Sequence, residues 1–304
     1  MIGERRALAS FVAFSVLAGG NAVAVRFSNR ELPPLWGAGL RFVFGAILLG
    51  IVMGVMRLRL PRPWDSAGAA LYGLLGFGGA YALAYVALVR LHAGIGQTLL
   101  ALVPLATLLL AVAWRQERLR REGVIGGVVA LTGVAVISGG SVDATLPLPS
   151  VLAALGSVLC IAQSAVLVRR LPPMHPVSMN TLGMAAGALL LVLLSAIVGE
   201  PHPLPTQAET WLALAYVVPI GSVVVFILYL MVLRQWAASR AAYGFVIIPF
   251  VTVALSAWLD DEPLRWSLIF GGPLVLVGVY LGALRTRSFA PTEAAPGYDE
   301  RSAR

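Results

Sequence analysis

The chain contains no lysine, a single cysteine and few charged residues of any kind. Charged residues make up 12% of its 304 residues and hydrophobic residues 59%, whereas a soluble domain carries about 25% charged residues. The one cysteine, Cys160, allows no intrachain disulfide and no cysteine metal cluster, and it is typical of a small packing residue. These shortages exclude an ordinary soluble domain and a fold that depends on disulfides.

Long apolar runs dominate the chain, and short charged clusters separate them. Each run is close to the ~20 residues that an α-helix needs to cross a bilayer. In hydrocarbon each run must be helical, because its backbone groups find no water to bond. We therefore expect an all-α polytopic membrane protein with ten transmembrane helices, at residues 7–26, 34–56, 67–89, 94–114, 124–140, 149–168, 177–198, 210–233, 240–259 and 266–284.

The sequence repeats itself at an offset of 145 residues. Eight residues of the first half have identical counterparts 145 positions later: Pro104, Glu117, Leu119, Arg120, Gly126, Gly127, Gly133 and Val134 return as Pro249, Glu262, Leu264, Arg265, Gly271, Gly272, Gly278 and Val279. A shorter echo near the start of each half is followed by Leu32-Pro33-Pro34 and by Leu171-Pro172-Pro173. Internal repeats indicate duplicated units. We expect one five-helix repeat in 1–145, a second in 146–285 and a disordered, cytoplasmic tail in 286–304.

The positive charges indicate the orientation of the chain. All 22 basic residues are arginines. With a cytoplasmic N-terminus, 17 of them fall on the inner side and 4 on the outer side, and Arg41 lies inside a span. This asymmetry is typical of topology signals rather than of a nucleic-acid surface. Because five helices are an odd number, the second repeat must be inverted relative to the first, and both termini are expected in the cytoplasm.

Several motifs, in order, resemble those of EamA-type members of the drug/metabolite transporter superfamily. They are Gly19-Gly20-Asn21-Ala22-Val23-Ala24-Val25-Arg26, Leu40-Arg41-Phe42, the prolines Pro104 and Pro249, Glu117-Arg118-Leu119, Glu262-Pro263-Leu264 and the glycine pattern of the fifth and tenth spans. The resemblance covers about residues 7–285, although Ala22 stands where the family often has an aromatic residue. It implies ten helices, cytoplasmic termini and the export or exchange of small metabolites, often amino acids.

Arg41 is a charged residue inside a predicted membrane span. A charge at mid-membrane costs several kcal/mol, so its side chain should face protein, water or the interface. Two interpretations remain open at this point. The guanidinium attracts a substrate carboxylate near an external vestibule, or it extends outward to the interface or pairs with a loop carboxylate such as Glu31.

Other polar residues in the apolar runs are candidates for the wall of a substrate cavity. Small-molecule cavities combine apolar walls with a few polar groups, and the candidates are Asn21, Tyr81, Tyr85, Gln97, Gln163, Ser164, Tyr243 and Thr252. Hydrogen bonds between helices are the simpler interpretation for Asn21, Gln163, Ser164, Tyr243 and Thr252. For Tyr81 and Tyr85 the alternatives are packing and anchoring at the interface.

Two pairs of repeat counterparts are candidates for moving parts. Pro104 and Pro249 are expected in mid-helix, where proline removes a backbone donor and frees the carbonyl a turn earlier, near Leu100 and Phe245. They are either hinges or static kinks. Glu117 and Glu262 end their helices and either gate each side by pairing with arginines or form solvated salt bridges.

The distribution of acidic residues narrows the function. All 14 Asp and Glu residues fall in loops, helix ends or tails, so the chain lacks the buried carboxylate common in carriers of protons or cationic drugs. We expect a secondary transporter in the cytoplasmic membrane that exports amino acids or related zwitterions by alternating access. It needs no cofactor or metal, binds no nucleic acid, and is a monomer or weak homodimer. A multidrug carrier, a membrane-embedded enzyme and a structural subunit are the alternatives, although no catalytic motif is present.

Overall fold

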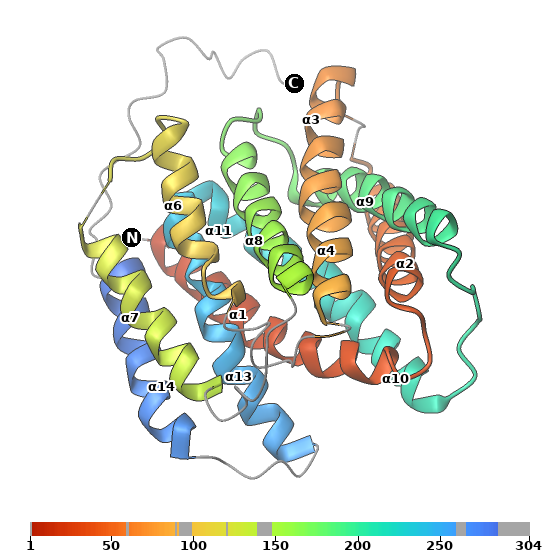
Figure 1. Cartoon of the computed structure of the whole chain (residues 1–304). Helices are drawn as coiled ribbons and strands as arrows, with labels where there is room; N and C mark the ends of the chain where they lie inside the picture. Colours follow the sequence, from red (N-terminus) through yellow and green to blue (C-terminus); the bar gives the residue numbers. More distant parts are fainter. Residues whose placement is uncertain are drawn as a thin grey trace.

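The computed structural model describes residues 2–58, 61–88, 90, 99–119, 121–138, 148–259 and 266–284, and every regular element in these ranges is a helix (Figure 1). Consecutive segments join end to end into ten rods. The segments are α1 (Ile2–Ser28), α2 (Pro34–Val55), α3 (Pro63–Gly73), η1 (Leu74–Gly79), α4 (Ala80–Leu88), α6 (Val103–Ala113), α7 (Arg121–Ser138), α8 (Leu148–Val168), α9 (Pro176–Val198), α10 (Ala208–Tyr216), η2 (Val217–Val224), α11 (Val225–Gln235), α12 (Ala238–Ala242), α13 (Gly244–Leu259), α14 (Trp266–Val279) and η3 (Tyr280–Leu284).

Six of these rods are long and apolar enough to cross a membrane. They are α1, α2, the α3–η1–α4 rod, α8, α9 and the α10–η2–α11 rod. Three shorter apolar helices, Val103–Ala113, Ala238–Thr252 and Phe270–Gly282, accompany them. The expected spans coincide with the rods, and the largest difference is at 94–114. Part of that span, including Gln97, lies outside the described residues, as do Glu262 and the tail 286–304.

Local sequence determines where several helices begin and end. Proline opens α2, α3 and α9, at Pro34, Pro63 and Pro176. A first-turn N–H has no partner within the helix, so proline costs nothing there, and its fixed φ already suits the helix. At the other end of α9, Gly199 takes a left-handed φ of 77°, which glycine adopts without steric cost.

The two halves of the chain carry the same succession of rods. An offset of 145 residues places α1 on α8, α2 on α9, α3–α4 on α10–α11 and α7 on α14. In both halves the third rod contains a π-helical segment, which is η1 in the first half and η2 in the second. The two segments lie at matching positions. The counterparts α2 and α9 pack against each other, as do α7 and α14 (Figure 1).

Pro104 does not lie in mid-helix, contrary to the expectation from the sequence. It occupies the first turn of α6, after a turn at 101–102, because a helix can begin at a proline more easily than continue through one. Its counterpart Pro249 lies inside α13, as expected. Pro104 therefore lies at the start of its helix, whereas its counterpart Pro249 lies within one.

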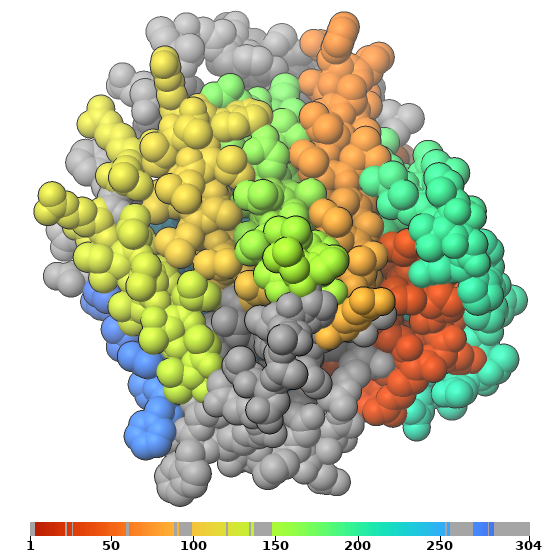
Figure 2. All heavy atoms as spheres, in the orientation of Figure 1, coloured from red at the N-terminus to blue at the C-terminus, as the bar shows by residue number. Residues whose placement is uncertain are grey.

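Close contacts between backbones hold the rods together. A Cβ built on Gly73 of α3 would lie 1.9 Å from the carbonyl oxygen of Gly183 in α9, so only glycine allows this approach. On the face shown in Figure 2, α8 runs between α6 and α4 and packs against both. These contacts bring helices of the two halves around a common centre.

Candidate functional site

A cavity of about 430 Å³ lies between the two halves of the chain. Its wall comes from α1, α2, the α3–η1–α4 rod and Leu100 on one side, and from α8, α11 and α13 on the other. Most of the lining is apolar or aromatic, with a few polar side chains, which is the composition of a small-molecule site. Arg30 and Arg41 are its charged lining residues, and no carboxylate lines it among the described residues.

Arg41 lies on α2 with its side chain held in the cavity wall. Its Nε donates to the hydroxyl of Ser222 at 2.7 Å, and Nη2 donates to the carbonyl oxygen of Gly221 at 3.1 Å. The rings of Phe42 and Tyr81 each lie 5.1 Å from the guanidinium carbon. Tyr85, one turn beyond Tyr81, interacts with the same guanidinium. A neutral, partly aromatic shell thus fixes the orientation of this cation.

The charge of Arg41 has no partner of opposite sign in the described part of the chain. Its residue is 2% exposed, so the guanidinium does not reach the outer surface. Glu31, the loop carboxylate considered as a partner, instead accepts hydrogen bonds from the backbone and hydroxyl of Thr206 at 2.6 Å and from the Gln207 backbone. A buried charge without a partner of opposite sign is costly, which makes Arg41 an unusual residue in this wall.

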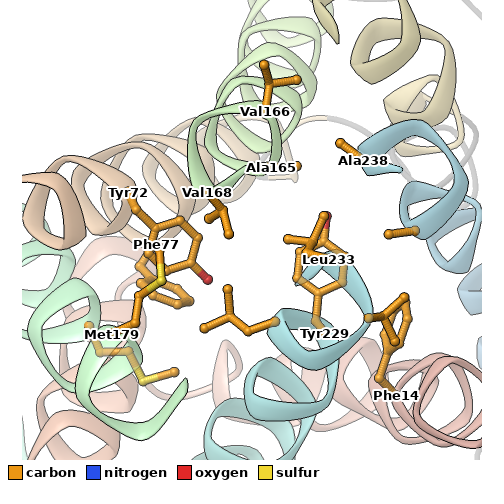
Figure 3. Packing of buried hydrophobic residues seen from close by; sticks show 14 of the residues in the cluster. Phe14, Tyr72, Phe77, Ala165, Val166, Val168, Met179, Tyr229, Leu233 and Ala238 are labelled. Atoms are coloured by element: carbon orange, nitrogen blue, oxygen red, sulfur yellow. The ribbon is translucent and has the colours of Figure 1, made fainter. Parts of the chain in front are cut away.

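Aromatic rings continue the wall away from Arg41. Tyr81 packs edge-on against Phe42, with 4.8 Å between the ring centroids, and lies 6.3 Å from Tyr85. Phe77 lies 5.1 Å from Phe42 and 4.7 Å from Phe226. Figure 3 shows Phe77 beside Tyr72, apart from Tyr229 and Phe14. These faces form an apolar compartment that suits the body of an organic solute.

Six of the sequence-predicted binding residues line this cavity. They are Asn21, Arg41, Tyr81, Tyr85, Ser164 and Thr252. Asn21 Nδ2 donates to the Gly221 carbonyl at 3.0 Å, so α1 and α2 meet on the same backbone oxygen of η2. Thr252 Oγ1 donates to the carbonyl of Gly19 at 3.0 Å. These polar groups therefore also tie helices together, the simpler role considered for Asn21 and Thr252.

Two other predicted residues lie away from the cavity wall. Gln163 is half-buried on α8, next to Ser164, and Tyr243 is buried between α12 and α13. The hydroxyl of Tyr243 donates to the Gly123 carbonyl on α7, and a Cβ built on Gly282 would collide with the Tyr243 ring. Tyr243 therefore packs between helices and does not line the cavity.

The residues four positions before each proline also line the cavity. They are Leu100 and Phe245, counterparts in the two halves. A proline inside a helix leaves the carbonyl four residues earlier without its helical donor. This applies to Pro249 and Phe245 in α13 but not to Pro104, which lies in the first turn of α6. Sequence reasoning did not single out Tyr229, which lines the cavity from α11.

The cavity reaches the surface at one end of α1. Asn29 and Arg30 line it there, and both are exposed. Arg30 pairs with Glu209 at 3.6 Å and stacks on Phe27, with its guanidinium carbon 4.4 Å from the ring centroid. Its charge is therefore partly compensated at the mouth, unlike that of Arg41.

Toward the opposite end, hydrogen bonds join the two halves, and we call this set of contacts the clasp. Glu117 accepts hydrogen bonds from the backbone and hydroxyl of Ser239. Gln116 Nε2 donates to the Val166 carbonyl at 2.9 Å, and Arg170 donates to the Trp114 carbonyl. The sequence predicted an arginine partner for Glu117. The partner here is Ser239, because the first turn of α12 offers an unpaired backbone N–H as well as a hydroxyl.

A strongly apolar chain whose two like halves enclose a largely apolar cavity with a few polar groups, open at one end and clasped at the other, defines a membrane transporter as the class of protein. A model described as the EamA-like transporter family matches residues 5–139 and 148–283. The chain therefore belongs to the EamA-like transporter family. It is a multi-pass protein of the inner (cytoplasmic) membrane that carries small molecules, and it is not an enzyme.

Individual relatives match along most of the chain. The uncharacterized inner membrane transporter YedA of Escherichia coli (strain K12) is 26% identical, over 88% of this chain and 90% of the relative. A probable terminal-alkyne amino-acid exporter of Streptantibioticus cattleyicolor is 29% identical, over 84% of this chain and 86% of the relative. A solved crystal structure that is 22% identical covers 91% of this chain and 96% of its own, with a TM-score of 0.77. This last likeness concerns the fold alone.

Proposed function

We propose that this transporter exports small metabolites that carry a carboxylate, amino acids among them, and that Arg41 binds the carboxylate. The observation behind the proposal is the buried guanidinium of Arg41 in the cavity wall without a described carboxylate partner. A substrate carboxylate would supply the missing charge, and the guanidinium presents paired donors that match carboxylate geometry. The relative named as a probable amino-acid exporter supports this class of substrate.

We further propose that residues 1–145 and 146–285 are inverted five-helix repeats with both chain termini in the cytoplasm. The arginine distribution and the matching order of rods support this arrangement. In that orientation the mouth at Asn29 and Arg30 faces outward and the clasp faces the cytoplasm. The structure then corresponds to an outward-open state, and exchange of conformations between the repeats gives the inward-open state.

The charge of the cavity disfavours the multidrug alternative. Carriers of cationic drugs need anionic groups in the binding site, whereas the charged side chains of this wall are Arg30 and Arg41. A cation would therefore enter a positive field. A carboxylate would find one favourable partner at the mouth and another at depth.

Transport by proteoliposomes tests this function. Labelled amino acids are presented against sugars and organic cations, and the best-transported acid is compared with its amide, which has nearly the same shape but lacks the negative charge of the carboxylate. We expect transport of the acid and loss of at least ten-fold with the amide or in Arg41→Gln. Arg57→Gln, on an exposed residue just after the end of α2, serves as the matched control. Equal handling of the acid and its amide would reject Arg41 as the anchor.

A further inference from the structure

We infer that the cavity has a second recognition point, formed by Tyr72 and Tyr229, for a hydroxyl group at the far end of the substrate from its carboxylate. Both tyrosines line the cavity, from α3 and α11. Both are buried, at 2% and 4% exposure. The inference rests on the proposed function, because it takes the carboxylate at Arg41 as the other end of the substrate.

Tyr229 carries a hydrogen-bonding group that the protein leaves unused. Its hydroxyl is buried and has no hydrogen-bond partner among the described residues. A buried hydroxyl without a partner costs about 1–3 kcal/mol, and buried polar groups nearly always find partners. Because Tyr229 also lines the cavity, a small shift of its ring would let a bound molecule supply the missing partner.

Tyr72 offers the complementary half of a hydrogen-bonding pair. Its hydroxyl donates to Oδ1 of Asn180 at 3.3 Å, so its donor is engaged and its oxygen lone pairs remain as acceptors. Asn180, on α9, is fully buried and acts as a positioning residue behind Tyr72. Figure 3 shows Tyr72 and Tyr229 on separate helices across the packed centre. A substrate hydroxyl can then donate to Tyr72 and accept from Tyr229, whereas a methyl or hydrogen at the same place satisfies neither.

The helices also determine how far this pair lies from the anion site. Tyr72 precedes Tyr81, which contacts Arg41, by nine residues, or ~13 Å along the rod. Tyr229 follows Ser222, which bonds Arg41, by seven residues, or ~10 Å. The rings of Phe77 and Phe226 lie between the two levels. The substrate class is thus a carboxylate joined to an apolar or aromatic body that ends in a hydroxyl.

Pairs of acids that differ only in one phenolic hydroxyl test the second recognition point. Dissociation constants are measured by calorimetry on the purified full-length protein for 3-(4-hydroxyphenyl)propionate against 3-phenylpropionate. The shorter pairs 4-hydroxyphenylacetate/phenylacetate and 4-hydroxybenzoate/benzoate show which distance between carboxylate and hydroxyl the cavity accepts. The pair L-tyrosine/L-phenylalanine adds an ammonium group. We expect the hydroxylated member of the best-fitting pair to bind at least ten-fold more tightly, because a site built for a hydroxyl rejects the analogue that lacks it.

Tyr229→Phe is the decisive variant, since it removes a hydroxyl that has no hydrogen-bond partner among the described residues and should leave the protein stable. We expect the preference for the hydroxylated acid to fall to about one-fold, while binding of the parent acid is unchanged. Tyr243→Phe, which loses a hydroxyl outside the cavity, should keep the preference. Equal affinities within every pair in the unmodified protein would overturn the inference, as would a preference that survives Tyr229→Phe.

The same titrations keep this inference separate from the proposed function. Replacing 3-phenylpropionate by 3-phenylpropionamide tests the anion site alone. Binding that depends on the carboxylate but ignores the hydroxyl overturns the second recognition point and leaves the anchor at Arg41 in place. Equal binding of acid and amide rejects the anchor, and the inference fails with it.

Discussion

Arg41 places a buried positive charge where the fold gains little from it. Its described partners, among them Ser222 and the Gly221 carbonyl, are neutral groups. Replacement of buried charges by apolar side chains of similar length is often neutral or stabilising. We therefore expect Arg41→Met to have an unchanged or higher Tm in detergent than the unmodified protein, and to lose the rise in Tm that a transported carboxylate produces.

Arg41→Lys separates charge from geometry. It keeps the cation but replaces the planar fork by a point charge, so we expect weaker but measurable carboxylate binding in the same thermal assay. A fall in Tm of Arg41→Met by ten degrees or more would instead assign Arg41 a structural role. In that case the guanidinium would be a cross-link between α2 and η2.

Glu31 connects the loop after α1 to the segment before α10. Hydrogen bonds that its carboxylate accepts from the Thr206 hydroxyl and from the backbone N–H groups of Thr206 and Gln207 lower its pKa to about 2 from an ordinary 4.5. Because the folded-state pKa is the lower one, its contribution to stability is complete above pH 4.5 and is lost as the pH falls toward 2. We expect Tm to decline over this window, and to decline less in Glu31→Gln. Parallel curves for the two proteins would contradict this assignment.

The sequence predicted those site residues that are polar within an otherwise apolar span. Arg41 and Asn21 stand out as polar groups in apolar runs, and both line the cavity. Tyr229 does not stand out, because a tyrosine near a helix end suits the membrane interface equally well. Gln163 and Tyr243 are of residue types that often line cavities. The sequence does not determine how each helix is rotated about its axis, and in the structure neither residue lines the cavity.

At the scale of elements, the contact between α3 and α9 depends on glycine. A Cβ on Gly73 would meet the backbone of Gly183, which cannot yield as a flexible side chain would. We expect Gly73→Ala to destabilise the protein by about 1–3 kcal/mol, the range for overpacking, and to lower Tm in detergent. Gly54→Ala is the control, because nothing lies within 4 Å of a Cβ there. Equal Tm values for the two variants would contradict the close approach.

The helices were predictable because hydrophobic length alone defines a membrane span. The observed rods follow the expected spans closely from α8 to α11. The sequence did not predict the break before Pro104, since a proline is compatible with both a kink and a helix start. Nor did it predict the π-helical segments η1 and η2. Such segments widen a helix by one residue per turn and are frequent at functional sites. Here η1 lines the cavity through Gly76 and Phe77, and η2 binds Arg41 through Gly221 and Ser222.

At the scale of the whole molecule, an open mouth and a clasp at opposite ends of one cavity imply a balance between two states. The clasp joins the halves through Glu117 and Ser239. A hydrogen bond to a charged group contributes about 1.5–3 kcal/mol, and ~1.4 kcal/mol changes a population ratio ten-fold. Weakening the clasp should therefore close the mouth in a large fraction of molecules.

Cysteine labelling in whole cells measures this balance. With Cys160 replaced by serine, Asn29→Cys places the single thiol at the exposed mouth. A membrane-impermeant maleimide added outside should label it. Adding Glu117→Gln should slow labelling, by at most about ten-fold, because ~1.4 kcal/mol taken from the clasp lowers the ratio of outward-open to inward-open molecules by that factor. Glu122→Gln, on the exposed start of α7, should leave the rate unchanged. Labelling only in inverted vesicles would reverse the proposed orientation, and equal rates in both glutamate variants would show that the clasp does not hold the outward-open state.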